Sequence, residues 1–110
     1  TPLYSSAASD VYKRQGRSAL SMARLEAHYF VNDCFMPQDH ILANISVIRH
    51  LPARIIQGRH DVICPPATAH RLADAWGRQA SLRIVDDAGH STFESGIAHA
   101  LLAALDEFAI

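Results

Sequence analysis

Two short apolar segments with the same surroundings constrain the fold of this sequence more than any other feature. "ARIIQG" (53–58) and "SLRIVD" (81–86) are each typical of a short buried strand, and each is followed by a polar loop. A segment with helical periodicity follows each loop, over 66–76 and over 93–109. This order predicts a βαβα unit, in which helices cover a parallel sheet. The expected fold class is therefore α/β.

The two segments expected to be helices carry signals for their ends and their apolar faces. Pro65 and Pro66 stand at the start of the first segment, where a missing N–H costs little, and Gly77 follows its end. Its apolar residues recur at helical spacing: Ala69, Leu72, Ala73 and Trp76. In the second segment the expected apolar face consists of Phe93, Ile97, Leu101, Leu105 and Phe108.

The amino-terminal half gives weaker signals. The first residues, "TPLYSSAASDVYKRQ", are small, polar and aperiodic, and they resemble a translated sequencing adapter, so we expect residues 1–15 to be non-native and disordered. A helical pattern follows over 16–27, and a short helical turn or irregular connection is expected within 40–52. The predicted parts of the chain are therefore 1–15, 16–50 and 51–110.

The composition is that of a globular protein, with 49% hydrophobic and 19% charged residues. The net charge of −1 and the scattered charges give no sign of nucleic acid or an anionic membrane as a partner. We see no apolar stretch of membrane-span length and no signal-peptide pattern. Cys34 and Cys64 are too few and too far apart for a disulfide framework, so we expect free thiols and a cytoplasmic location.

Asp61 and His90 follow the two predicted strands at matching places, in "GRHD" and "AGHS". Because functional loops lie at the carboxyl ends of parallel strands, which are about 4.8 Å apart, the two side chains are expected to meet. In an acid–base relay, a carboxylate orients an imidazole and stabilises the imidazolium that forms. Taken singly, each residue has a simpler explanation as a turn or cap residue. Their joint placement favours the relay.

A relay of this kind needs a nucleophile, and we find no serine that fits. Ser91 is next to His90, but neighbouring side chains in an extended segment diverge. Ser18, in "GRSAL", lacks the second glycine of a G-x-S-x-G elbow and also fits a helix face.

The same loops contain residues that commonly bind metals: His60, Asp61, Cys64 and His90. Their spacing matches no standard zinc pattern, and the seven histidines of the chain are dispersed. We therefore expect neither a metal nor another cofactor.

Three stretches resemble the carboxyl-terminal part of prolyl iminopeptidases: "ARLEAHYF" (23–30), "LPARIIQGRHDVICPPATAHRLADAW" (51–76) and "LRIVDDAGHSTFESGI" (82–97). These enzymes are serine peptidases of the α/β-hydrolase fold that release an N-terminal proline from peptides. The likeness covers roughly residues 18–110. "GRxD" and "AGHS" alone would indicate only an α/β-hydrolase. The combination of "ARLE-HYF", "GRHDVICP" and "AGHS" restricts the resemblance to prolyl iminopeptidases. The resemblance implies that 51–110 is the carboxyl-terminal part of the hydrolase core, and that 16–50 is the end of the helical cap and the connection back to the core.

The resemblance also implies roles for individual residues. Asp61 would be the triad acid, His90 the triad base, and Glu26 one of the carboxylates that bind the free α-amino group of a peptide with an N-terminal proline. A carboxylate facing an ammonium group would explain the demand for a free N-terminus. The residues alone favour Glu26 as a solvated helix residue. Cys64 is expected to line the pocket rim and not to be a nucleophile, because no basic partner for it is apparent.

The sequence departs from the family pattern at three positions. Ala27 stands where Asn is usual, His60 where Tyr is usual, and Ser95 where Pro is usual. The first two lie near the expected site, so they leave the substrate preference open.

The position of the acid in the chain also matters. In this fold the triad runs Ser, Asp, His, but only 60 residues precede Asp61. We therefore expect a fragment that lacks its nucleophile and is inactive alone. Two alternatives stay open: a fragment of another α/β-hydrolase, such as an esterase or epoxide hydrolase, or a non-catalytic α/β module that binds a partner through its sheet edge.

Overall fold

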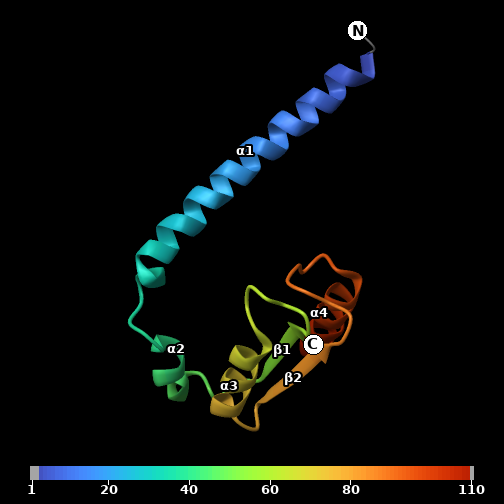
Figure 1. The fold of residues 1–110 in the computed structure, drawn as a ribbon. Coiled ribbons are helices and arrows are strands. Elements are labelled where there is room, and N and C mark those ends of the chain that lie inside the picture. Colours follow the sequence, from blue (N-terminus) through green and yellow to red (C-terminus); the bar gives the residue numbers. More distant parts are fainter. Residues whose placement is uncertain (1–2, 110) are drawn as a thin grey trace. The chain divides into compact units, whose positions relative to one another are not determined.

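A computed structural model describes the backbone of residues 3–109 and the side chains of residues 15–109. The chain divides into two units, Thr1–His40 and Ile41–Ile110, and each is considered by itself. The elements follow in the order α1 (Leu3–Val31), η1 (Asp33–Phe35), α2 (His40–Ala43), η2 (Ile45–Val47), β1 (Ala53–Gly58), α3 (Pro66–Trp76), β2 (Ala80–Val85) and α4 (Ser95–Phe108) (Figure 1).

The first unit consists mainly of the long helix α1. This helix includes the segment 16–27 that periodicity predicts, and it begins at Leu3, within the stretch 1–15 whose non-native origin stays a prediction. The physical reason for the length of this helix is that residues 3–31 contain no proline and a single glycine, Gly16, so little in the sequence interrupts helical hydrogen bonding. Residues 1 and 2 lie outside the described part. Every described side chain of α1 is exposed.

A left-handed turn ends α1. Asp33, Cys34 and Phe35 have φ angles of 51°, 55° and 57°, a region that costs non-glycine residues energy. The ring of Phe35 packs edge-on against Tyr29 with centroids 5.2 Å apart, and it also contacts the ring of His28. These aromatic contacts offset part of the backbone cost.

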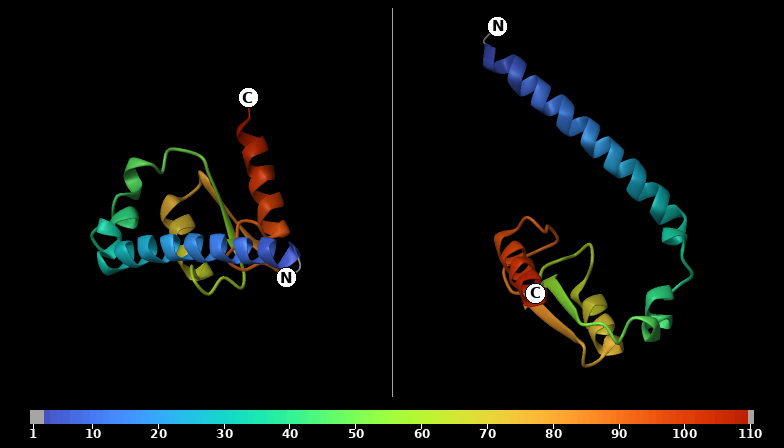
Figure 2. Two further views of the ribbon diagram at one scale, coloured as in Figure 1. Left: turned by 90° about the horizontal axis from the view of Figure 1, so that it is seen from above. Right: turned by 180° about the vertical axis from the view of Figure 1, so that it is seen from behind.

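The second unit contains the expected βαβα arrangement. Strands β1 and β2 pair in parallel, with a register that runs from Ala53 opposite Ala80 to Gly58 opposite Val85. Strand β1 has the predicted bounds, whereas β2 begins and ends one residue earlier than predicted. Helices α3 and α4 lie on opposite faces of this two-stranded sheet (Figure 2). The α/β class is thereby confirmed for this unit.

The core lies mainly between the sheet and α4. Its buried residues are Val85, Ala88, Ile97 and Ala100, with Ile56 and Leu101 packed against them. On the other face, Ala69 of α3 is buried, and the indole Nε1 of Trp76 donates a hydrogen bond to the carbonyl oxygen of Leu51 over 2.9 Å.

The expected apolar face of the last helix needs correction. Helix α4 begins at Ser95, so Phe93 precedes it and is 93% exposed. Leu105 is also exposed, because eight residues of helix place it about 80° around the axis from Ile97. Ala100, which is nearer in phase to Ile97, is buried in its place.

Two further expectations concern the whole chain. Within the part of the chain that the structure describes, no helix is long and apolar enough to cross a membrane. Cys34 and Cys64 are free thiols, and both are exposed.

Candidate functional site

The loop after β1 folds around the side chain of Asp61. The carboxylate oxygen Oδ1 accepts hydrogen bonds from the backbone N–H groups of Ile63, over 3.0 Å, and Cys64, over 2.8 Å. A turn in which an aspartate side chain accepts backbone N–H groups two and three residues later is common after a strand. Asp61 is buried, with 9% of its surface exposed. The loop therefore holds the carboxylate in one orientation by bonds within its own sequence.

The loop after β2 is held by other side chains. Oε2 of Glu94 accepts the backbone N–H of Gly89 over 2.8 Å. The hydroxyl of Ser91 accepts the N–H of Phe93 over 3.1 Å, and the carbonyl oxygen of Ser91 accepts the N–H of Glu94 over 3.2 Å. Ser91 thus forms the turn that leads into α4. His90 stands at the exposed side of this loop.

Backbone contacts join the two loops. The backbone N–H of His60 donates to the carbonyl oxygen of Ala88 over 2.9 Å. The backbone N–H of Arg59 donates to the carbonyl oxygen of Val85 over 3.0 Å. Arg59 also forms an ion pair with Asp86, with Nε 2.7 Å from Oδ1. The two loops therefore keep a fixed separation.

Gly58 allows the two loops to approach each other. A Cβ atom at this position would lie 2.1 Å from the carbonyl oxygen of Gly89 and 2.7 Å from that of Ala88. Both contacts are with backbone, which has little room to move. A side chain at residue 58 would therefore push apart the loops that carry the acid and the histidine.

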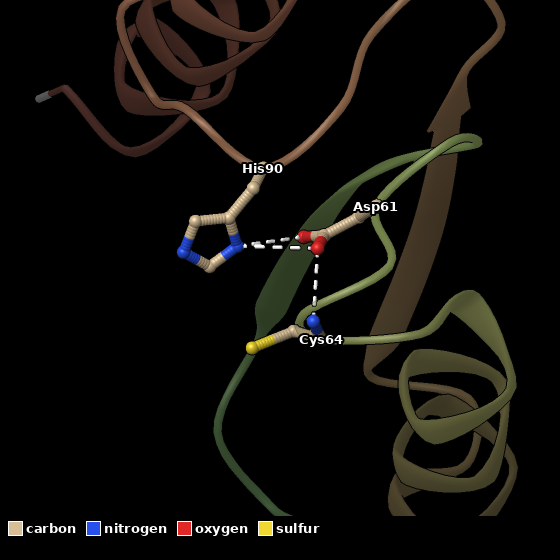
Figure 3. A group of neighbouring side chains, drawn as sticks. All are labelled: Asp61, Cys64 and His90. Carbon is tan, nitrogen blue, oxygen red and sulfur yellow. Dashed lines mark hydrogen bonds and ion pairs between the residues drawn. The ribbon is translucent and has the colours of Figure 1, made fainter. Parts of the chain in front are cut away.

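The structure confirms that Asp61 and His90 meet. Nδ1 of His90 lies 3.0 Å from Oδ2 and 3.2 Å from Oδ1 of Asp61, while the other ring nitrogen, Nε2, points away from the carboxylate (Figure 3). The side chain of His90 is 51% exposed, whereas that of Asp61 is 9% exposed. With Asp61 ionised, Nδ1–H donates to it and Nε2 carries a free lone pair. The pair is thus oriented for general base catalysis at Nε2.

The surroundings of Asp61 favour its charged form. The hydrogen bond from the backbone N–H of Cys64 is the largest influence and lowers the pKa of the Asp61 carboxyl. Burial acts in the opposite direction, but the contacts with His90 and Ile63 lower the pKa further. Asp61 is therefore a carboxylate at neutral pH.

Cys64 joins this pair, whereas Glu26 belongs to the other unit. The Sγ atom of Cys64, a carboxylate oxygen of Asp61 and a ring nitrogen of His90 lie within 4.8 Å of one another (Figure 3). Glu26 lies on α1 with an exposed side chain, so its role in binding an amine stays a prediction. Ser18 is also exposed on α1.

Sequence reasoning missed the groups that hold the histidine loop. No local sequence pattern marks Glu94 or Arg59 as part of the site. Both side chains nevertheless hold the backbone next to Asp61 and His90. The sequence gives one weak indication for Glu94, because an acidic side chain just before a helix stabilises the helix N-terminus.

Known proteins similar to this chain are proline iminopeptidases. The chain is 51% identical over 87 residues to the proline iminopeptidase of Arabidopsis thaliana, a match that covers 78% of this chain and 23% of the relative. It is 45% identical over 89 residues to a probable proline iminopeptidase of Leptolyngbya boryana, covering 80% of the chain and 27% of the relative. For the proline iminopeptidase of Neisseria gonorrhoeae the identity is 44% over 91 residues, covering 82% and 29%.

These matches confirm the resemblance found in the sequence motifs. The chain spans about a quarter of the length of the curated relatives that it matches, between 23% and 29% in these three. No protein-family model matches the chain.

Proposed function

We propose that this chain is the carboxyl-terminal part of a serine aminopeptidase that releases N-terminal proline from peptides. The observation that carries the proposal is the Asp61–His90 pair, with Nδ1 and Oδ2 3.0 Å apart at the carboxyl ends of two parallel strands. The identity of 51% over 87 residues to a proline iminopeptidase supports the substrate class. In this proposal the enclosing fold is the α/β-hydrolase fold, and the setting is the cytoplasm.

In this proposal each member of the pair performs one step. Nε2 of His90 takes the proton from a serine hydroxyl as that oxygen attacks the peptide carbonyl, and Asp61 stabilises the imidazolium through Nδ1–H. His90 then gives this proton to the leaving amine, and water hydrolyses the acyl-enzyme by the same route. The serine comes from a part of the parent enzyme outside this sequence. The isolated chain is therefore catalytically incomplete.

Glu26 and Cys64 account for substrate binding in the proposal. The Glu26 carboxylate binds the ammonium group of the substrate's N-terminal residue, through charge-assisted hydrogen bonds. Cys64 is exposed and close to His90, which supports a place at the rim of the pocket.

A chimeric enzyme tests the proposal. Residues 18–110 replace the matching segment of the Neisseria gonorrhoeae proline iminopeptidase, and hydrolysis of a proline arylamide is measured. The isolated chain should show no turnover, whereas the chimera should be active and should lose at least about a thousandfold of its kcat on His90→Ala. Turnover by the isolated chain that His90→Ala abolishes would overturn the fragment proposal. A folded chimera without activity would overturn the assignment of the pair.

The substrate class needs a separate test, because an acid–histidine pair of this geometry would also serve an esterase. In the chimera, Glu26→Gln should weaken kcat/KM for a substrate with a free α-amine by roughly tenfold or more, but leave an N-blocked ester unaffected. Equal effects on both substrates would favour another α/β-hydrolase.

A further inference from the structure

Asp61, Cys64 and His90 bring three different metal-binding groups together at the ends of β1 and β2. We propose that they form a binding site for Zn²⁺, and that the bound ion blocks the acid–base pair. The donor atoms are a carboxylate oxygen, a thiol sulfur and an imidazole nitrogen, all within 4.8 Å of one another (Figure 3). This inference concerns binding to the chain itself and does not depend on the proposed peptidase activity.

The donor set suits zinc. Cysteine, histidine and aspartate are its usual ligands, at about 2.3 Å for sulfur and about 2.0–2.2 Å for nitrogen and oxygen. A tetrahedral arrangement at these lengths separates the donors by roughly 3.3–3.6 Å. The donor atoms now lie within 4.8 Å of one another. The most distant pair therefore has to approach by little more than about 1 Å to reach the tetrahedral separation. Mg²⁺ and Ca²⁺ prefer sets made of oxygen alone, so the sulfur and nitrogen select against them.

The fold prepares two of the ligands and leaves the third free to adjust. The bond from the Cys64 N–H to Oδ1 of Asp61 fixes these two residues within one turn. The side chain of His90 is 51% exposed, so it can rotate toward an ion that enters from solvent. Three protein ligands leave a fourth position for water, as in open zinc sites.

Proton balance shows why the ion inhibits the pair. Cysteine binds zinc as its thiolate, so binding releases the proton of the Cys64 thiol to solvent. If the ion binds Nδ1 of His90, the ring proton moves to Nε2, which then has no lone pair. If the ion binds Nε2, that lone pair is occupied directly. In both cases His90 can no longer take a proton from a hydroxyl group.

Calorimetric titration of the full 110-residue chain with ZnCl₂ tests the site, with any purification tag removed and no chelator present. We expect one Zn²⁺ per chain, and a thiolate-to-metal absorption band when Co²⁺ is the probe. Cys64→Ser should weaken the affinity by at least about tenfold and abolish the band. The matched controls Cys34→Ser and His99→Ala change an exposed cysteine and an exposed histidine elsewhere, and both should bind as the wild type does.

Each other outcome counts against the site. No binding, or equal binding by the wild type and Cys64→Ser, would overturn the proposal. Equal weakening by Cys34→Ser would also overturn it, by indicating sites shared between chains. Thermal unfolding without metal shows whether Cys64→Ser stays folded, and Cys64→His, which restores a ligand, should regain affinity. In the chimera, Zn²⁺ should inhibit the enzyme, and Cys64→Ser should raise the Zn²⁺ concentration for half-inhibition by at least about tenfold, measured against the activity of the same variant without metal. A chimera without activity would refute the peptidase proposal and leave the binding result standing.

Discussion

The loops that carry Asp61 and His90 are built in opposite ways. The acid loop closes on its own carboxylate, which is buried and accepts two backbone N–H groups from the three residues that follow it. The histidine loop uses the side chains of Ser91 and Glu94 as supports, and His90 itself stays half exposed. This difference matches the two tasks, because an orienting acid needs a fixed position and a base needs access to its substrate.

Gly58→Ala should affect both loops and have the largest effect. The added Cβ would lie 2.1 Å from the carbonyl oxygen of Gly89, so the loops must separate or the chain must unfold. We expect a loss of about 3 kcal/mol in the free energy of unfolding, measured by urea denaturation. Gly16→Ala is the control, since nothing lies within 4 Å of its Cβ position and alanine favours a helix. Equal stability changes in the two variants would contradict the close approach at Gly58.

Asp61→Ala should disrupt the acid loop more than Asp61→Asn does. Alanine leaves the N–H groups of Ile63 and Cys64 without their acceptor, whereas asparagine keeps an oxygen in the same place. Amide hydrogen exchange at these two residues should therefore become much faster in the alanine variant and only slightly faster in the asparagine variant. If both variants exchange like the wild type, the carboxylate does not hold this loop.

The charge of Asp61 should make stability depend on pH in a defined direction. Its pKa in the folded protein lies below the ordinary value of 3.8, chiefly because the Cys64 N–H donates to the charged form. Folding therefore gains from this group above the ordinary pKa and loses that gain as the pH falls through the folded pKa. The difference in unfolding free energy between the wild type and Asp61→Asn should shrink below pH 3.8. A difference that grows on acidification would reverse the sign of the effect.

Glu94→Ala should loosen the histidine loop while leaving the acid loop intact. The carboxylate accepts the N–H of Gly89 over 2.8 Å, and its loss should cost about 1 kcal/mol. We expect faster amide exchange at Gly89 and His90 but unchanged exchange at Cys64. Glu94→Gln keeps an acceptor oxygen and should restore most of the protection. Equal loosening of both loops would show that they do not have separate supports.

Ser91→Ala should have the smallest effect. Its hydroxyl accepts one exposed N–H, that of Phe93, so removal should cost about 0.5 kcal/mol or less. In the chimera the variant should retain nearly full kcat, because Ser91 shapes a turn and does not attack the substrate. A complete loss of turnover with normal stability would instead identify Ser91 as a reacting group.

Local signals predicted much of this fold. Strand β1 and helix α3 have their predicted bounds because a short apolar segment, Pro66 and Gly77 mark them directly in the sequence. The meeting of Asp61 and His90 was predictable as well, since it follows from where parallel strands end. The domain boundaries, and the roles of the site residues, stay predictions.

Features that depend on packing were not predictable. The bond from the Gly89 N–H to Glu94 and the lack of space at Gly58 arise only when the loops are folded against each other. Phe93 belongs to the periodic pattern, yet the turn at Ser91 removes it from the helix. The grouping of Cys64 with His90 joins residues 26 positions apart, a spacing that matches no metal motif.

The close approach at Gly58 has a consequence for how sequence variants of this region can be interpreted. Because Gly58 has no side chain, the ends of β1 and β2 can pack closely, and Asp61 can contact His90. A library selected only for folding would retain glycine there, and so would a library selected only for turnover. Retention of Gly58 among variants therefore carries no information about which of the two was selected.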